Sequence, residues 1–150
     1  MTFSYPHPRP AMTVDLVVRH AGRVLLIQRG GEPFAGAWAF PGGFVDGDRS
    51  GDAAKETVEA AAVRELLEET RVTVAEDDLH LIGVFSAPGR DPRGWTISAA
   101  FAVELHEAPS PQASDDARAA ELFATDAVPD LAFDHAEILA RGLALLDRLP

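Results

Sequence analysis

The chain has 150 residues, 47% of them hydrophobic, which suits one domain with a buried core and excludes an intrinsically disordered protein. Its net charge of −11 argues against nonspecific nucleic-acid binding, and no apolar run approaches the roughly 18 residues of a membrane span. Cysteine is absent and no signal-peptide pattern is present, so disulfides and thiolate metal sites are excluded and a cytoplasmic location is expected.

The first part of the chain is expected to form an extended lead-in and then a β-hairpin. Residues 1–11 are rich in proline, which favours extended backbone over regular structure. Two apolar runs follow, over residues 13–20 and 23–30. The pair Ala21-Gly22 between them predicts a hairpin turn.

A polar loop and a helix are predicted next. Residues 46–52 have the composition of a loop, and a helix is expected over residues 53–70. Val58, Ala62 and Leu66 recur at helical spacing in that span, which places them on one face of the helix.

The second half of the chain is expected to add strands and a last helix. Strands are predicted over residues 79–88, 95–105 and 120–124, with the turn-forming loop GRDPRG between the first two. The last helix is expected to begin near Asp134, where Asp134 and Glu137 match a capping box. Strands mixed with two long helices favour one α+β domain in which helices pack against a sheet.

The stretch RELLEET, residues 64–70, gathers acidic side chains on one stripe of the predicted helix. Glu65 meets Glu68 and Glu69 at the spacings where like charges repel and destabilise a helix. Carboxylate oxygens are the ligands that hard cations such as Mg²⁺ and Mn²⁺ prefer, so the cluster predicts a divalent-metal site. The alternative is an acidic face that is simply solvated.

The surrounding residues resemble the Nudix box, whose pattern is glycine, five residues, glutamate, seven residues, and then Arg-Glu-U-x-Glu-Glu-x-Gly-U, with U a bulky aliphatic residue. Here PGGFV at residues 41–45 precedes Glu56, seven residues separate Glu56 from Arg64, and RELLEE follows without a gap. Val72 takes the last aliphatic position. The resemblance implies a single Nudix domain over residues 1–150, an α/β/α sandwich with a mixed sheet, a box helix and a C-terminal helix.

The sequence departs from the family pattern at two places. Twelve residues separate Gly43 from Glu56 instead of five, which indicates an insertion in the loop that precedes the helix. Arg71 stands where the family has the glycine that ends the helix, and a left-handed conformation there is expected to cost about 1 kcal/mol. We expect an altered turn with the ligands retained.

The resemblance also implies roles for individual residues. The implied metal ligands are Glu65, Glu68 and Glu69, with Mg²⁺ or Mn²⁺ as the cofactor. The implied catalytic group comprises Glu56, Arg64, which would orient the glutamates, Glu68, and a loop carboxylate for which Asp116 is the choice by position, with Asp115 and Glu121 as alternatives. Gly42 and Gly43 are expected to let the backbone approach substrate phosphates.

Two further stretches resemble ADP-ribose pyrophosphatases of the family: GRDPRGWTISAAF at residues 89–101 and LAFDHAEIL at residues 131–139. Arg29, Arg90 and Arg93 are therefore expected to bind the substrate, although a structural turn held by Asp91 is an equal alternative for the last two. Phe34, Trp38 and Trp95 offer rings for an adenine, with core packing favoured for each. The five histidines show no metal spacing and are assigned to surface or capping positions.

These features predict metal-dependent hydrolysis of a nucleoside diphosphate derivative, most simply ADP-ribose to AMP and ribose 5-phosphate. One alternative is a nucleoside triphosphate or dinucleoside polyphosphate pyrophosphohydrolase, and another is a ligand-sensing Nudix domain with weak catalysis. Family regulators usually carry a DNA-binding domain after the Nudix domain, and none is expected in the few residues that follow the last predicted helix, so the sensing alternative is ranked last. The expected partners are a nucleotide-sugar substrate and a second copy of the chain, with no nucleic acid and no membrane.

Overall fold

The structure is a computed structural model that describes residues 6–47 and 53–150. Part of the proline-rich lead-in and the centre of the loop before the helix, residues 1–5 and 48–52, lie outside the described residues. The strands are β1 Ala11–His20, β2 Arg23–Arg29, β3 Trp38–Ala39, β4 Gly42–Phe44, β5 His80–Phe85, β6 Thr96–Glu104 and β7 Ala117–Ala124. The helices are α1 Val58–Thr70, the short 3₁₀ helix η1 Glu76–Asp78, and α2 His135–Arg148.

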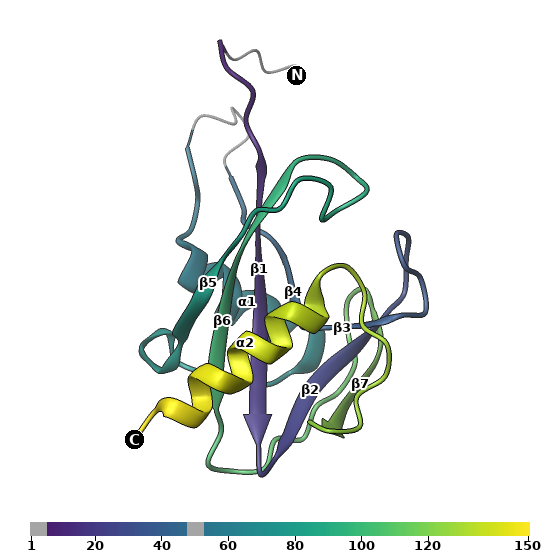
Figure 1. The fold of residues 1–150 in the computed structure, drawn as a ribbon, viewed down its shortest axis with the longest axis vertical. Coiled ribbons are helices and arrows are strands. Elements are labelled where there is room, and N and C mark those ends of the chain that lie inside the picture. The colour runs from purple at the N-terminus through teal and green to yellow at the C-terminus, as the bar shows by residue number, and fades with distance from the viewer. Residues whose placement is uncertain (1–5, 48–52) are drawn as a thin grey trace.

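The strands form one mixed sheet of seven strands with the order β3-β2-β1-β6-β5. β1 and β6 run parallel over their whole length, and the other pairs are antiparallel. β4 pairs with β1 and β7 pairs with β2, so neither strand lies on this path. The sheet therefore divides at the end where the short strands β3 and β4 lie (Figure 1). β1 pairs with β2, β4 and β6, so its backbone N–H and C=O groups have hydrogen-bond partners and its neighbouring strands are held in fixed positions.

The two long helices cover opposite faces of this sheet, as Figure 1 shows. Successive side chains of β1 point to opposite faces. Val14, Leu16 and Val18 therefore pack toward α1, whereas Val17 packs toward α2. Gly142 lets α2 approach closely, because a Cβ there would lie 2.9 Å from Cδ1 of Ile82. The predicted α/β/α sandwich is confirmed.

The predicted hairpin is present, because Arg19 pairs with Val24 and His20 with Arg23. Ala21 and Gly22 both have positive φ, at 48° and 75°, as the preferred two-residue hairpin turn requires.

The predicted start of the first helix was wrong. α1 begins at Val58, because the Thr57 side chain accepts the Ala60 N–H at 3.0 Å and caps the helix there. The residues before it are held elsewhere: the Lys55 N–H donates to the Asp46 carbonyl across the loop.

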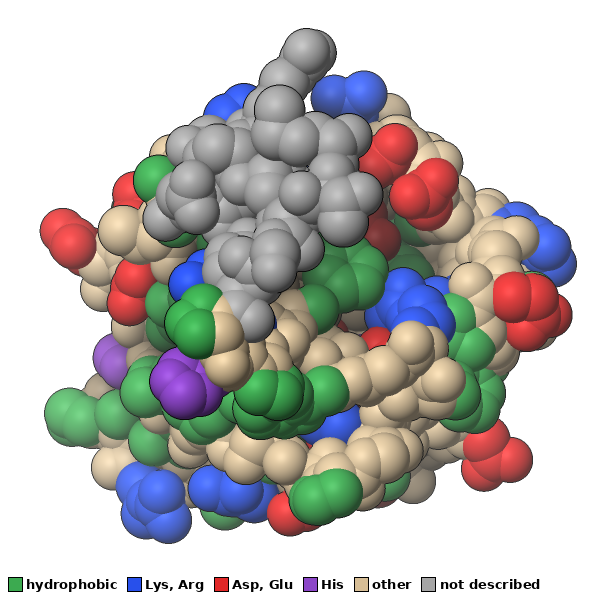
Figure 2. All heavy atoms as spheres, turned by 90° about the horizontal axis from the view of Figure 1, so that it is seen from above, with side chains coloured by type: hydrophobic (Ala, Val, Ile, Leu, Met, Phe, Trp, Pro, Cys, Tyr) green, Lys and Arg blue, Asp and Glu red, His purple; other side chains and the backbone are tan. Residues whose placement is uncertain are grey.

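Neither described long helix has the length and apolar content needed to cross a membrane. Positive and negative side chains are interspersed on the face shown in Figure 2, where Lys and Arg do not gather into one basic patch.

Candidate functional site

The acidic helix ends in the left-handed turn that the family's glycine would adopt. Arg71 has φ 63° and ψ 14°, and its N–H donates to the Leu67 carbonyl, so the turn is kept and the expectation of an altered turn was wrong. The last turn also holds the loop before β7, because the Ser114 hydroxyl donates to the Glu68 carbonyl and the Ser114 N–H donates to the Glu69 carbonyl at 3.1 Å. This loop carries Asp115 and Asp116 to the same end of the helix.

Arg64 gathers three of the glutamates that the sequence singles out. Its guanidinium binds both carboxylate oxygens of Glu56, with a shortest distance of 2.6 Å. It also contacts Glu65 at 3.0 Å and Glu68 at 3.2 Å. The hydrogen bonds to Glu56, and next the charge of Glu65, raise the pKa of Arg64. A further bond joins Arg64 to the Phe44 carbonyl at 3.1 Å, which ties α1 to β4.

Glu56 and Glu68 therefore lie outside the cavity that holds Glu65 and Glu69. The prediction that Glu65, Glu68 and Glu69 together bind the metal stays a prediction: Glu65 and Glu69 line the cavity, whereas Glu68 pairs with Arg64. Among the described residues there is no group of three acidic or histidine side chains with the geometry of a metal site. The Glu68 side chain is 44% exposed and turned to Arg64, because that attraction outweighs the approach to two like charges.

Glu65 and Glu69 face a cavity of about 700 Å³, which is within the usual range for a small-molecule site. The Gly42 N–H donates to Oε1 of Glu69 at 2.8 Å, and the Glu65 carboxylate lies so close to Gly43 that a Cβ would be 2.6 Å from its Oε1. The Gly42 N–H thus holds the Glu69 carboxylate, and the absence of a side chain at Gly43 leaves room for the Glu65 carboxylate. Both glycines therefore have a role besides the expected approach to phosphate.

Burial disfavours the ionised form of both glutamates. Burial, opposed by Arg64, raises the pKa of Glu65 to about 7. Burial, followed by repulsion from Glu65, raises the pKa of Glu69 to about 8 despite the bond from Gly42. Two converging carboxylates with oxygen donors suit a Mg²⁺ or Mn²⁺ ion, which usually takes one or two protein carboxylates and completes its shell with water and phosphate. The residues present fit such an ion.

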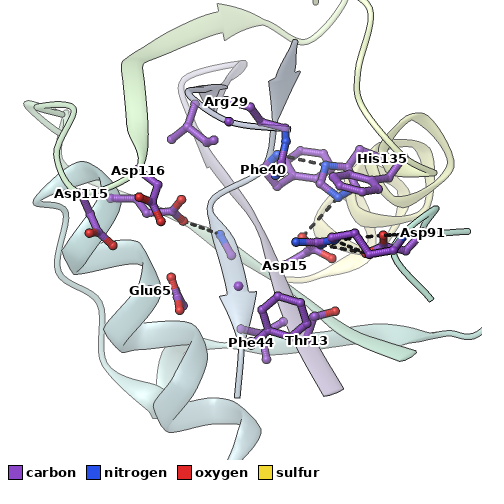
Figure 3. A pocket seen from close by; sticks show the side chains of 18 of the residues that line it. Thr13, Asp15, Arg29, Phe40, Phe44, Glu65, Asp91, Asp115, Asp116 and His135 are labelled. Carbon is purple, nitrogen blue, oxygen red and sulfur yellow. Dashed lines mark hydrogen bonds and ion pairs between the residues drawn. The ribbon is translucent and has the colours of Figure 1, made fainter. Parts of the chain in front are cut away.

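Asp115 and Asp116 line the same cavity on the α1 side, whereas Asp91 lies on the opposite side (Figure 3). Asp115 has a positive φ of 56°, and the Asp116 carbonyl accepts the Gly30 N–H at 3.2 Å. The loop is thereby held between α1 and β2, with both carboxylates close to Glu65.

Arg29, Arg90 and Arg93 all line the cavity, but their surroundings differ. The Arg90 guanidinium is 5% exposed and bound by both oxygens of Asp134, at 2.6 and 2.8 Å. Arg93 is 41% exposed and bound to Asp91, which also accepts the Arg93 N–H. Burial opposes ionisation of Asp91, yet the Arg93 bonds hold its pKa below the ordinary value. The structural-turn alternative therefore holds for this loop, and it places both arginines at the cavity.

Arg29 has the least neutralised guanidinium of the three. Its Nε donates to the Pro33 carbonyl at 2.7 Å, and no described carboxylate forms an ion pair with it. Burial, and next the positive charge of Arg93, lower the pKa of Arg29. The two guanidinium groups lie 4.9 and 5.7 Å from the centre of the Phe133 ring. Two cations that share one aromatic ring favour an anionic ligand between them.

The aromatic residues of the cavity are not those that the sequence suggested. Trp38 packs against Phe123 at 4.9 Å between ring centres, as core packing requires, and Trp95 is 55% exposed away from the core. Phe40, Phe44 and Phe133 line the cavity instead.

The assignment of all histidines to surface or capping positions was wrong for His135, which is 3% exposed. It contacts Asp15, another buried residue that sequence reasoning missed. A charged residue inside the apolar run TVDLVV was the available signal, because a buried charge needs a partner. The capping box is also absent, since the Asp134 side chain binds Arg90 and makes no cap bond.

The comparisons with known proteins agree with this geometry. The NUDIX domain model matches residues 7–142. The ADP-ribose pyrophosphatase of Methanocaldococcus jannaschii is 42% identical over 130 residues, which cover 87% of this chain and 71% of that protein. The NUDIX domain of Shewanella oneidensis NrtR, solved with ADP ribose, superposes with a TM-score of 0.82 at 26% identity, covering 95% of this chain and 94% of that one.

A third similar structure is a bifunctional NMN adenylyltransferase/ADP ribose pyrophosphatase from Francisella tularensis, complexed with AMP and a Mn ion. Its TM-score is 0.74 at 29% identity, and the match covers 95% of this chain and 43% of that one. With the box helix, the paired carboxylates and the sandwich fold in place, this chain belongs to the NUDIX domain family, as a Nudix pyrophosphohydrolase.

Proposed function

We propose that this chain hydrolyses ADP-ribose to AMP and ribose 5-phosphate with a bound divalent metal ion, Mg²⁺ or Mn²⁺. The observation that carries the proposal is one cavity that holds the buried carboxylate of Glu69 and the partly buried carboxylate of Glu65, together with two arginines, Arg29 and Arg93. A diphosphate joins both kinds of group, because its oxygens bind a divalent ion and guanidinium groups at the same time.

Each group has a defined task in this proposal. Glu65 and Glu69 hold the ion, which would neutralise charge on the diphosphate oxygens and lower the pKa of a bound water. Arg29 and Arg93 bind the diphosphate, and Phe133 between them supplies a flat apolar surface. Hydrolysis of a diphosphate depends mainly on positioning and charge stabilisation, so few further groups are needed.

The remaining acidic residues act on the water or on the ligands. We assign to Asp116, with Asp115 beside it, the task of orienting or deprotonating the attacking water, because both residues line the cavity. Arg64, held by Glu56, contacts Glu65 and keeps that side chain in one orientation. Glu68 is one helical turn from Arg64 and can join the ion only by leaving its ion pair.

The choice of ADP-ribose over other diphosphates is supported by the relatives. One relative with 42% identity is an ADP-ribose pyrophosphatase, and a domain of similar shape is complexed with ADP ribose. The second of these also supports the alternative of a ligand-sensing domain, because a complex demonstrates binding without cleavage.

The test is a product assay with the purified chain and Mg²⁺. ADP-ribose, a nucleoside triphosphate and a dinucleoside polyphosphate are incubated separately, and the products are identified by chromatography. AMP and ribose 5-phosphate from ADP-ribose, with the highest kcat/KM of the panel, are expected. Inert ADP-ribose with turnover of another substrate would refute the substrate. A rise in Tm on adding ADP-ribose without any product would favour the sensing alternative.

A further inference from the structure

The residues Asp134 and His135 at the start of α2 reach two different walls of the cavity. The Asp134 carboxylate binds Arg90 through two hydrogen bonds, which anchors the loop that carries Arg93. His135 faces the other way, and its Nδ1 accepts the Phe40 N–H at 3.1 Å. The rings of Phe40 and His135 are also stacked, with 5.0 Å between their centres and an angle of 28°.

The bond from the Phe40 N–H determines which nitrogen of the neutral His135 ring carries the proton. A nitrogen that accepts a backbone N–H carries no proton, so Nδ1 is bare and the proton of the neutral ring is on Nε2. Nε2 lies 3.2 Å from Oδ1 of Asp15 and donates to it. The other oxygen of Asp15 accepts the Ser98 hydroxyl at 2.6 Å. Each end of the ring thus has one partner of the correct polarity.

This network lies in the interior, where unpaired polar groups are costly. His135, Asp15 and Ser98 are 3%, 8% and 0% exposed. Removing one partner leaves another buried and unsatisfied, which is unfavourable. A fully satisfied network of this kind holds its members in one arrangement.

The arrangement continues from Phe40 to a proposed metal ligand. The Pro41 carbonyl accepts the Leu16 N–H at 3.0 Å, and the Gly42 N–H donates to Oε1 of Glu69 at 2.8 Å. Gly42 has no room for a side chain, because a Cβ on it would clash with the Val14 carbonyl oxygen and lie 2.9 Å from Oδ1 of Asp15. The His135 ring therefore fixes the backbone two residues before the amide that holds Glu69.

We propose that His135 is a positioning residue for Glu69, acting through the backbone of Phe40, Pro41 and Gly42, with Asp15 and Ser98 holding its ring. The inference rests on the proposed function for the identity of Glu69 as a metal ligand. It gives the segment LAFDH a role: Asp134 orients the arginine loop and His135 orients the carboxylate, so one helix start aligns both halves of the cavity.

The test measures Mn²⁺ affinity by titration without substrate, so that binding is separated from turnover. His135→Phe keeps a flat ring but removes the acceptor for the Phe40 N–H, and we expect Mn²⁺ affinity to fall about 10-fold or more. His135→Asn can supply an oxygen near the position of Nδ1, and its affinity is expected within about 3-fold of wild type. His80→Phe, the same change at an exposed histidine of β5, is the matched control.

A second readout uses the metal-free protein. Hydrogen exchange at the Gly42 amide, measured by NMR, is expected to be faster in His135→Phe than in wild type and unchanged in His80→Phe. Thermal denaturation establishes that each variant is folded. If His135→Phe does not fold, His135→Leu takes its place, because it also removes the acceptor for the Phe40 N–H, and the same loss of Mn²⁺ affinity is expected.

Three results would overturn the proposal. The first is a folded His135→Phe, or its replacement His135→Leu, with wild-type Mn²⁺ affinity. The second is a His135→Asn protein as weak as His135→Phe, since the Phe40 bond would then not be the important one. The third is a wild-type protein that binds no Mn²⁺. A wild-type protein that binds Mn²⁺ but leaves ADP-ribose intact would overturn the proposed substrate and leave the positioning role standing.

Discussion

Replacing Gly43 by alanine is expected to impair metal binding and turnover while the fold survives. The new Cβ would lie 2.6 Å from Oε1 of Glu65, 2.7 Å from its Cδ and 2.9 Å from its Oε2. Ordinary contacts to a Cβ begin at 3.4 Å, so the carboxylate must retreat by 3.4 − 2.6, or 0.8 Å. Only the end of a flexible side chain has to move, which is why little effect on stability is expected.

A retreat of that size matters for the site because Mg²⁺ requires oxygens at about 2.0–2.1 Å in near-ideal geometry. A misplacement of about 1 Å commonly costs about 100-fold in rate. We therefore expect kcat for ADP-ribose to fall about 30- to 100-fold and Mn²⁺ affinity to fall about 10-fold, with Tm within about 2 °C of wild type.

Two other glycines supply the comparison for this experiment. Gly31→Ala is the matched control, because no atom lies within 4 Å of the Cβ that it would add. Gly42→Ala is the opposite case, since its Cβ would lie 2.1 Å from a backbone oxygen of β1, and the fold itself should lose about 3 kcal/mol or more. A Gly43→Ala protein with wild-type kcat and Mn²⁺ affinity would show that Glu65 does not bind the ion from the position described.

Further outcomes are expected from the same site and its helix. Glu69→Gln should lower kcat about 100- to 1,000-fold with Tm nearly unchanged, because the new side chain can still accept the Gly42 N–H but carries no charge. Glu59→Gln, on the same helix, is the control. Equal rates in the two variants would contradict the role of Glu69. The Tm of the metal-free protein should fall as pH rises from about 5 to about 9. Burial raises the pKa of Glu65 to about 7 and of Glu69 to about 8, so both are still protonated in the folded state at pH values where the unfolded chain is already ionised. Mg²⁺ should raise Tm most at the alkaline end, and a Tm that does not change with pH would count against this pair of carboxylates. Arg71→Gly should raise Tm by about 1–4 °C, because glycine relieves the left-handed strain of about 1–2 kcal/mol. The higher conformational entropy of glycine in the unfolded chain offsets only part of this gain in stability. Arg71→Ala keeps the strain and should show no such rise in Tm.

Local features of this protein could be predicted from the sequence because each depends on residues that are near one another in the chain. The hairpin follows from Ala21-Gly22, and the apolar face of α1 follows from the spacing of Val58, Ala62 and Leu66. The end of α1 at Thr70 follows from the end of the helical pattern. The spacing of Glu65 and Glu69 one turn apart places both on one face of α1, which needs no knowledge of the rest of the chain.

The tertiary structure decided which partner each polar group takes. Asp134 has the sequence of a helix cap, but the sheet brings Arg90, 44 positions away, within 2.6 Å, and a buried arginine binds a carboxylate more strongly than a backbone amide does. Phe40 and His135 are 95 positions apart and meet only because the segment before α2 pairs with β3. Glu68, equal to its neighbours in sequence, turns to Arg64 and leaves the cavity. Contacts of this range depend on strand order and on which charges fold into reach, and no local pattern encodes either.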